Sequence, residues 1–275
     1  MTGASKGSLP ASLTLVGAGR MGGALLRGWL DGGLDPAGTT VVDPQVGPEI
    51  TALCAERGVA LNPDRPPVAQ TLILAMKPQG LDDAAATLAP LVGPGTLVVS
   101  ILAGKTLANL AARLPQAGAF VRTMPNLPAS IGRGATGVVA SAGITSGQRA
   151  EADALLACSG LVEWLDDEAL IDAVTAVSGS GPAYAFLLAE ALAEAGAKAG
   201  LPPAMAARLA RATVAGAGAL LDANPVEAGE LRRNVTSPGG TTAAALAVLM
   251  RDGGLPDLLA EAVEAAKRRS GELAG

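Results

Sequence analysis

Residues 231–242, LRRNVTSPGGTT, place hydroxyl groups, a proline and two adjacent glycines just before an alanine-rich stretch of helical character. Gly239 and Gly240 allow backbone N–H groups to converge on a ligand. Thr241 or Thr242 can cap the following helix and direct a hydroxyl into the same space. A helix N-terminus carries partial positive charge and favours a carboxylate. The segment can equally be a plain turn with an N-cap, so the rest of the sequence must decide.

A second stretch, residues 13–30, reads LTLVGAGRMGGALLRGWL and carries glycines at the spacing G-x-G-x-x-G. Gly17 can make the tight turn after the apolar run, Gly19 lets the backbone approach a pyrophosphate, and Gly22 permits close packing of a helix on a strand. The helix that follows offers free N–H groups to phosphates. The spacing predicts a nucleotide-binding loop, although a chain with 36 glycines can also use it as a structural turn.

An acidic residue, Asp43, ends the β-branched run 39–43 and lies 21 residues after Gly22. At this place an acidic side chain binds the 2′-hydroxyl of a cofactor ribose, and its charge repels a 2′-phosphate, which favours NADH. Arg20, inside the glycine loop, can still reach a phosphate, whereas the next arginine after Asp43 is Arg57. The sequence therefore leaves the choice between NADPH and NADH open.

The residue types that are missing narrow the chemistry further. The chain has no histidine, which excludes Ser-His-Asp and Cys-His mechanisms and removes the commonest metal ligand, so we expect no metal site. The net charge of -5 provides no basic stripe for a nucleic-acid partner. Cys54 and Cys158 form no spaced motif, and we interpret them as small buried residues of a cytoplasmic protein.

Alternating apolar runs and helical stretches predict the elements that position these groups. Beyond the runs at 13–16 and 39–43, strands are predicted at 71–75, 96–101, 119–123, 135–140 and 161–165. Continuous apolar strands that alternate with helices indicate a mostly parallel sheet covered on both faces. We therefore expect a flexible tail over residues 1–11 and an α/β Rossmann-type dinucleotide-binding domain over residues 12–165.

Unusual residues follow three of these strands, at the edge where ligands bind in such sheets. They are Met76, Lys77 and Pro78 after the strand at 71–75, Ala103 and Gly104 after the strand at 96–101, and Asn126 after the strand at 119–123. The lysine and the rigid proline would lie next to the nicotinamide ribose, and the amide could orient a nicotinamide or a substrate. A solvated lysine in an ordinary turn is the structural alternative.

From residue 166 to residue 275 the strands stop, and the pattern predicts an all-α domain. Residues 178–182, SGSGP, interrupt two helical stretches, and Pro182 suits the first turn of a helix because its missing N–H costs nothing there. The helix expected at 183–199 is apolar around most of its circumference, which one subunit of this size can hardly cover. We therefore predict a homodimer through this half. Three charged side chains in that helix argue against a membrane span.

Five stretches form a combination that is more specific than the glycine fingerprint alone. They are VGAGRMG (16–22), AMKPQ (75–79), VRTMPNLPASIGRGATG (121–137), VSGSGPAYAF (177–186) and NVTSPGGTT (234–242). Together they resemble the pyrroline-5-carboxylate reductase family, in the family's order and over essentially the whole chain after residue 12. The resemblance implies NAD(P)H-dependent hydride transfer to the C=N bond of (S)-1-pyrroline-5-carboxylate, which gives L-proline in the last step of proline biosynthesis.

The resemblance also implies an assembly and a set of sites. Family members combine a Rossmann domain with a helical domain that interlocks with a second subunit, often in rings of dimers. The implied substrate-binding residues are Val235, Ser237, Gly239, Gly240, Thr241 and Thr242, of which Thr242 would be catalytic by directing its hydroxyl at the imine nitrogen. The implied residues for NADPH or NADH are Gly17, Gly19, Arg20, Met21, Gly22, Asp43, Met76, Lys77, Pro78, Ala103, Gly104, Asn126 and Pro182.

Three other functions compete with this interpretation. A dehydrogenase of the β-hydroxyacid type usually needs a catalytic lysine on the first long helix after the sheet, and here Lys198, at the far end of that helix, is the only lysine between residues 106 and 266. A non-catalytic dinucleotide-sensing module would bind cofactor without turnover and would need no SPGGTT pocket. A related imine reductase that acts on a different ring or chain is the third.

Overall fold

The structure is a computed structural model that describes residues 8–274. It divides into two compact units. The first holds the described residues up to Gly179 together with those from Lys267 onward, and the second runs from Ser180 to Ala266. The expected domain boundary between residues 165 and 166 lies inside the first unit, because the short helix after the last strand still packs against the sheet.

Part of the segment that was predicted to be a flexible tail is packed. Residues 1–7 lie outside the described residues. Leu9, in contrast, packs against the core, Pro10 is buried, and the N–H of Ala11 donates to Oε1 of Gln70 at 3.2 Å. The packed part of the described chain therefore includes Leu9 and Pro10, just before β1.

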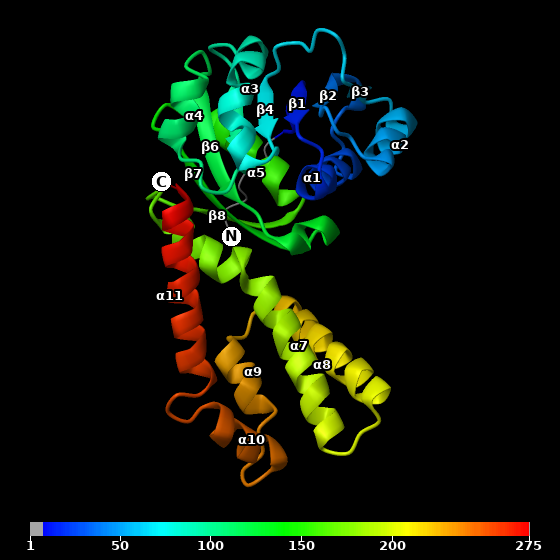
Figure 1. Cartoon of the computed structure of the whole chain (residues 1–275), viewed down its shortest axis with the longest axis vertical. Coiled ribbons are helices and arrows are strands. Elements are labelled where there is room, and N and C mark those ends of the chain that lie inside the picture. Colours follow the sequence, from blue (N-terminus) through cyan, green and yellow to red (C-terminus); the bar gives the residue numbers. More distant parts are fainter. Residues whose placement is uncertain (1–7, 275) are drawn as a thin grey trace. The chain divides into compact units, whose positions relative to one another are not determined.

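The first unit is built on an eight-stranded sheet of order β3-β2-β1-β4-β5-β6-β7-β8 (Figure 1). Its strands are β1 (Leu13–Val16), β2 (Thr39–Val42), β3 (Ala60–Leu61), β4 (Thr71–Leu74), β5 (Leu97–Ser100), β6 (Ala119–Met124), β7 (Gly134–Ala140) and β8 (Gly160–Trp164). All neighbours are parallel except β6 and β7. The predicted mostly parallel Rossmann-type sheet is confirmed. Only β3 was not predicted, because two residues are too few to show a period.

Helices cover both faces of this sheet (Figure 1). They are α1 (Arg20–Asp31), α2 (Pro48–Arg57), α3 (Leu81–Leu88), α4 (Leu107–Arg113), α5 (Ser146–Ala157) and α6 (Leu170–Val174), with 3-10 turns η1 (Pro36–Gly38), η2 (Pro78–Gly80), η3 (Ala89–Leu91) and η4 (Leu127–Ile131). Successive residues of each strand point to opposite faces. Leu13 and Leu15 therefore pack with α1, α2 and α5, whereas Leu72 and Leu74 pack with α3 and α4.

The second unit is entirely helical, as predicted. Its helices are α7 (Gly181–Lys198), α8 (Pro203–Ala223), α9 (Ala228–Asn234), α10 (Thr241–Leu249) and most of α11 (Leu255–Ala274). Small residues let α7 and α8 approach closely, since a Cβ at Gly196 would lie 3.3 Å from the Cβ of Ala206. Phe186 and Leu187 on α7 are each 62% exposed, so the apolar circumference predicted for this helix is not covered within one chain. Within the described chain, no helix combines the length and the apolar character that a bilayer span requires.

The break that the sequence predicts at residues 178–182 is narrowed to a bend at Ser180, because helical residues run up to Gly179 and α7 begins at Gly181. Residues 175–179 form a π-helical turn, η5 (Thr175–Gly179). Two hydroxyls donate to carbonyls one turn earlier, that of Thr175 to Ile171 at 2.8 Å and that of Ser178 to Val174 at 3.1 Å, a kind of bond that often bends a helix. Pro182 then lies in the first turn of α7, as predicted. Such π-turns often mark functional sites.

Glu151 on α5 is a buried carboxylate, 7% exposed, beside the amino end of β4. The hydroxyl of Thr71 and the side-chain amide of Gln70 donate to its two oxygens. Burial raises the pKa of Glu151 above its ordinary value, and the two hydrogen bonds, which favour the ionised form, offset this rise only in part.

The raised pKa of Glu151 makes a prediction about stability. The folded state binds the proton more tightly than the unfolded state. The resulting stabilisation is fully present below the unfolded-state pKa and is lost as the pH rises through the raised folded-state pKa. We therefore expect the wild type to lose free energy of unfolding relative to Glu151→Gln between acid and neutral pH. Urea unfolding of both proteins at several pH values measures this, and a difference that does not change with pH would contradict it.

Candidate functional site

The glycine loop between β1 and α1 has the shape that a dinucleotide requires. Gly17 has φ +88°, its N–H donates to the carbonyl of Val42 at 2.9 Å, and a Cβ there would lie 2.6 Å from the N of Met76. A Cβ at Gly22 would lie 2.2 Å from the carbonyl oxygen of Gly17. A Cβ at Gly19 would have nothing within 4 Å, so this glycine leaves open space in front of α1. The loop fits the three roles that the sequence predicts for its glycines.

The start of α1 is left open for an anion. Its N-cap residue is Gly19, which has no side chain to accept from the first N–H groups, and its first turn holds no acidic residue. The N–H groups of that turn therefore remain available to a phosphate. Arg20, the first helical residue, is exposed, whereas the side chain of Met21 packs against the core and leaves only its backbone for a ligand.

Asp43, which follows β2, is tied to the loops around it. Its Oδ2 accepts the N–H of Ala18 at 2.7 Å, and its Oδ1 accepts the N–H of Gln45 at 2.7 Å. Its own N–H and C=O pair with the side-chain amide of Asn62, both at 2.8 Å. Asp43 thus holds the glycine loop in place. Asn62 was not predicted, but it has φ 47° and precedes a proline, and Asn tolerates that left-handed region.

Two hollows lie at this edge of the sheet. The larger, about 680 Å³, falls in the usual size range of ligand pockets. It brings together five of the predicted cofactor residues, which are Gly17, Gly19, Asp43, Met76 and Lys77. A second hollow of about 530 Å³ shares Gly19 and Gln45 with the first and is lined by two arginines of α1, Arg20 and Arg27, and by Glu49 of α2. The glycine loop is therefore flanked by both acidic and basic side chains.

Other predicted residues lie outside the larger hollow but on the same edge of the sheet. Pro78 opens η2, directly after Lys77. Ala103 and Gly104 lie in the turn between β5 and α4. The last residues of β4 and β5 are paired across the sheet, so this turn emerges beside the segment that carries Lys77. The strand register therefore brings these groups together at one edge.

Asn126, after β6, is 8% exposed, and its amide is engaged at both ends. Its Oδ1 accepts the N–H of Ala135 at 2.9 Å, and its Nδ2 donates to the carbonyl of Ser178 in η5 at 3.0 Å. The amide therefore holds the π-helical turn against the sheet, a role that the sequence did not indicate. Pro182, predicted beside it at the cofactor, belongs to the second unit.

In the second unit, residues 237–240 form a tight turn. The N–H of Gly240 donates to the carbonyl of Ser237 at 3.0 Å. Pro238 occupies the second position and Gly239, with φ +70°, the third, which is the residue pattern of a type II turn. Val235, just before the turn, is 67% exposed. Pro238 and Gly239 thus set the conformation of the turn through their own backbone preferences.

The helix after this turn is uncapped. α10 begins at Thr241, and its N-cap is Gly240, which makes no side-chain hydrogen bond. The prediction that Thr241 or Thr242 caps the helix is wrong, because both residues lie inside its first turn. Its first backbone bond runs from the N–H of Ala244 to the carbonyl of Gly240 at 3.1 Å. The N–H groups of the first turn therefore have no partner within the helix and remain available to an anion.

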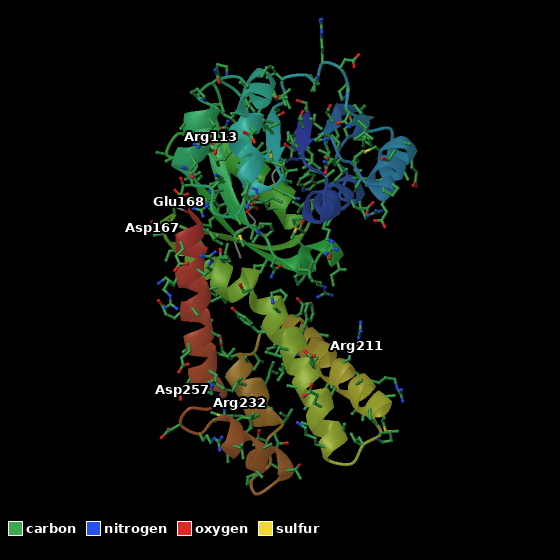
Figure 2. The ribbon with its side chains drawn as sticks, viewed as in Figure 1. Arg113, Asp167, Glu168, Arg211, Arg232 and Asp257 are labelled. Carbon is green, nitrogen blue, oxygen red and sulfur yellow. The ribbon has the colours of Figure 1, made fainter. Side chains whose placement is uncertain are left out.

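Basic side chains accompany this turn. Arg232 and Arg233 occupy the last turn of α9 and are exposed, and Arg232 is labelled on that helix in Figure 2. The hydroxyl of Thr236 donates to the carbonyl of Arg232 at 2.6 Å, which fixes the chain between α9 and the turn. Among residues 8–274, no group of three or more His, Cys, Asp or Glu side chains is placed to hold a metal ion.

Comparisons with known proteins assign the chain to a family. A family model described as "Pyrroline-5-carboxylate reductase dimerisation" matches residues 168–273, and one described as "NADP oxidoreductase coenzyme F420-dependent" matches residues 12–104. The pyrroline-5-carboxylate reductase of Pseudomonas aeruginosa is 42% identical over 264 residues, which cover 95% of this chain and 96% of that protein. The chain belongs to the pyrroline-5-carboxylate reductase family.

Other members of the family agree in sequence and in fold. The pyrroline-5-carboxylate reductase of a Synechocystis species is 44% identical over 214 residues, 77% of this chain and 78% of that protein. The solved structure of a pyrroline-5-carboxylate reductase from Coxiella burnetii superimposes with a TM-score of 0.89 at 33% identity and covers 97% of this chain and 99% of that one. The predicted α/β domain followed by a helical domain of the pyrroline-5-carboxylate reductase type is confirmed.

The glycine loop of this reductase family member supports a paired prediction. We expect Gly19→Ala to leave stability unchanged, because its Cβ meets nothing within 4 Å, but to weaken dinucleotide binding about tenfold or more by filling the cradle. We expect Gly22→Ala to lower both stability and binding, because its Cβ would collide with the carbonyl of Gly17. Thermal unfolding and titration of NADPH fluorescence measure the two effects.

Gly95→Ala is the matched control for these glycine variants, since a Cβ there also has open space and lies on a loop away from the cradle. It should change neither quantity. Normal dinucleotide affinity in Gly19→Ala would show that the loop does not hold the pyrophosphate.

Proposed function

We propose that this protein is an NAD(P)H-dependent pyrroline-5-carboxylate reductase, which reduces the C=N bond of (S)-1-pyrroline-5-carboxylate to give L-proline at the end of proline biosynthesis. The proposal depends on one observation. In this member of the family, two helices begin without a side-chain cap, and such helix starts can bind the phosphates of a dinucleotide and the carboxylate of the substrate. α1 begins behind a glycine cradle, and α10 begins behind the turn at residues 237–240. Both expose backbone N–H groups to negatively charged ligands.

The substrate carboxylate would be held by dipoles that are already in place. The resemblance implies donors at Gly240, Thr241 and Ser237; the N–H of Thr241 and the hydroxyl of Ser237 would donate to the carboxylate oxygens, whereas the N–H of Gly240 closes the turn onto the carbonyl of Ser237. Val235, exposed beside the turn, would line the ring. Because the turn is shaped by its proline and glycine, these donors need no rearrangement when the carboxylate binds, and preorganised donors of this kind are the effective ones.

Thr242 is the proposed catalytic residue. It lies in the first turn of α10 and is half-buried, and its side chain serves as no helix cap. Its hydroxyl would position the imine nitrogen and relay a proton to it. A cyclic imine is readily protonated, so the reaction needs no strong enzyme acid, which agrees with a chain that has no histidine. The protein then has to hold the nicotinamide and the imine carbon in line for hydride transfer.

The dinucleotide would be held along the edge of the sheet. The cradle of Gly17, Gly19 and Gly22, the N–H groups of α1, and the side chains near Lys77 and Pro78 would bind it, together with the turn that carries Ala103 and Gly104. When bound, the nicotinamide supplies the hydride that adds to the imine carbon.

The choice between NADPH and NADH depends on opposing charges. Asp43 lines the larger hollow and disfavours a 2′-phosphate there. Arg20 and Arg27 line the adjoining hollow, have no ion-pair partner among the described residues, and favour a 2′-phosphate. The ratio of the kcat/KM values with NADPH and with NADH reports which of these charges acts more strongly on the 2′ group of the cofactor.

We also propose that the active form is a homodimer through the helical unit, with rings of dimers as a further step. The apolar side chains that α7 leaves exposed, such as Phe186 and Leu187, support this, because single chains rarely expose contiguous apolar surface of this kind. The dimerisation model that matches residues 168–273 includes this helix. The free thiols of Cys54 and Cys158 suit a reducing compartment such as the cytoplasm.

The activity itself is tested by mixing the purified protein with pyrroline-5-carboxylate and following the oxidation of NADPH and NADH at the nicotinamide absorbance band. We expect turnover with at least one cofactor and formation of proline. A folded oligomer that binds dinucleotide but oxidises neither cofactor would contradict the proposal and favour a sensing module or another imine substrate.

The role of Thr242 gives a separate prediction. Thr242→Val keeps the shape of the side chain and removes the hydroxyl, so kcat should fall about tenfold to a hundredfold, whereas Thr242→Ser should keep most of the activity. Thr213→Val is the matched control, because that hydroxyl only donates to the carbonyl of Leu209 within α8. An unchanged kcat in Thr242→Val would remove the proposed role.

A further inference from the structure

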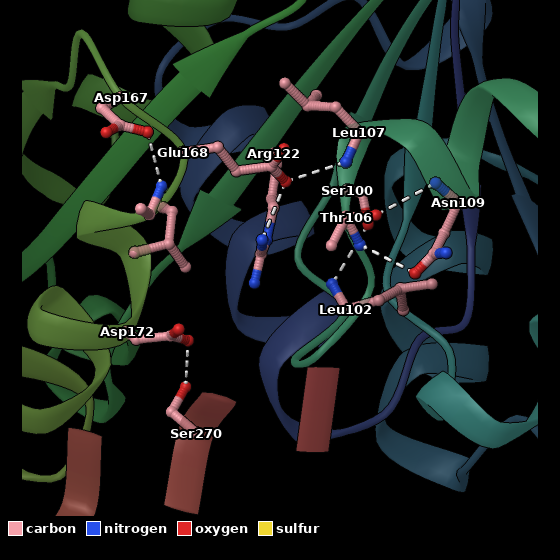
Figure 3. Close-up of polar contacts among 12 residues, drawn as sticks. Ser100, Leu102, Thr106, Leu107, Asn109, Arg122, Asp167, Glu168, Asp172 and Ser270 are labelled. Carbon is pink, nitrogen blue, oxygen red and sulfur yellow. Dashed lines mark hydrogen bonds and ion pairs between the residues drawn. The ribbon is translucent and has the colours of Figure 1, made fainter. Parts of the chain in front are cut away.

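A buried arginine forms an ion pair near the ends of the strands at which the cofactor is proposed to bind. Arg122 is on β6 and is 5% exposed, and its Nη1 lies 2.8 Å from Oε1 of Glu168, which follows β8 (Figure 3). The same carboxylate oxygen accepts the N–H of Leu107, the first residue of α4, at 2.8 Å. Glu168 thus joins a strand on one side to a helix start on the other, 61 residues away in sequence.

This carboxylate completes the anchoring of the turn between β5 and α4. At the strand end, the hydroxyl oxygen of Ser100 accepts the N–H of Leu102 at 3.2 Å. At the helix end, Thr106 and Asn109 bond each other's backbone N–H in a capping box, both at 3.1 Å. Glu168 accepts the next N–H along, so the turn at residues 102–106 is held at both ends by side-chain acceptors (Figure 3).

The anchored turn presents backbone donors at the dinucleotide edge. The N–H of Lys105 closes it onto the carbonyl of Leu102 at 3.3 Å, and Gly104 has φ +73°. The N–H groups of Ala103 and Gly104 themselves have no hydrogen-bond partner in the described part of the chain. β5, which precedes the turn, pairs with β4, and the predicted cofactor contacts at residues 76–78 follow the end of β4.

We propose that Arg122 and Glu168 are a positioning pair for cofactor binding. They touch no ligand. They fix the start of α4, and through it they hold the donors of Ala103 and Gly104 in the geometry in which a dinucleotide oxygen can accept from them. The carboxylate of Glu168 is 28% exposed, so without the guanidinium it would turn towards water and release the N–H of Leu107. The buried arginine keeps it in place.

The inference rests on the proposed dinucleotide site but not on the identity of the substrate. Its test is therefore the dissociation constant of NADPH and of NADH without pyrroline-5-carboxylate, read from nicotinamide fluorescence of the full-length protein. Failure of the proposed reaction would leave this measurement intact, because it needs no turnover.

The decisive variant is Glu168→Ala. We expect the dissociation constant of the better cofactor to rise about tenfold, while the KM for pyrroline-5-carboxylate stays within about twofold. Glu168→Gln keeps an oxygen that can accept from both Leu107 and Arg122, so it should restore most of the affinity. If the ion pair only stabilised the fold, Glu168→Ala would lower the midpoint of unfolding and would affect the cofactor and the substrate alike. Glu168→Gln would then not restore the affinity for the cofactor.

Asp82→Ala is the matched control. Asp82 pairs with Arg113 at the other end of α4, where the helix carries no proposed ligand contact. Breaking that pair should leave cofactor affinity unchanged. If Glu168→Ala does not fold, Glu168→Asp replaces it. This variant keeps a charge near Arg122 but is one methylene too short to reach both partners, and we expect the same loss of affinity. The proposal would be overturned by unchanged cofactor affinity in a folded Glu168 variant that has lost both bonds. It would also be overturned by an equal rise in the dissociation constant of the cofactor and in the KM for pyrroline-5-carboxylate.

Discussion

The close approach of two backbones where β1 turns into α1 is the constraint on which the first unit depends. Gly17 lies against the backbone of Met76, and Gly22 lies against the carbonyl of Gly17, so neither position has room for a Cβ. This approach sets α1 on the sheet with its N-terminus at the edge where the strands end. The core of Leu25, Leu26 and Trp29 then forms beneath it, and Trp29 donates to the carbonyl of Leu155 at 2.8 Å. The same glycines are therefore needed for packing α1 on the sheet and for the proposed binding of a dinucleotide.

A second theme is the difference between helix starts that are satisfied and helix starts that are left open. α4 and α5 begin with complete capping boxes, and α4 receives a further acceptor from Glu168. α1 and α10 begin at glycines without any side-chain cap. An open start alone is not a site, since α2 also begins behind a glycine. The open space at Gly19 and the turn at residues 237–240 support the two sites proposed above, because backbone N–H groups are held there without an acceptor inside the helix.

The helical unit differs from the first unit in how much of its apolar surface is buried within one chain. Only two of its alanines on α8, Ala206 and Ala210, are buried to within 3% exposure, while large side chains on α7 remain exposed. Burial of apolar area is the dominant favourable term in folding. A unit that leaves so much of it uncovered gains its remaining stability from a partner surface, in agreement with the dimerisation family to which residues 168–273 belong. Small residues suit such a unit, because they let helices approach closely.

The sequence alone determined the elements whose signal is local. Seven of the strands, the close approach at Gly17 and Gly22, and the all-α second half follow from short-range pattern and from the steric needs of single residues. It failed in three places, for different reasons. β3 is too short to show a period, and residues 175–179 form a π-helical turn that is held by the side chain of Asn126. On α10 the helix begins at Thr241, so both threonines lie inside its first turn.

Only the tertiary structure decided what the polar side chains bind. Asp43 holds the glycine loop together with Asn62, Asn126 holds η5, and Glu168 joins Arg122 to α4. Each of these bonds links residues 19 or more positions apart. No local pattern encodes such a partner, because it is chosen by strand order and register, and these are set by how the whole sheet buries its two faces.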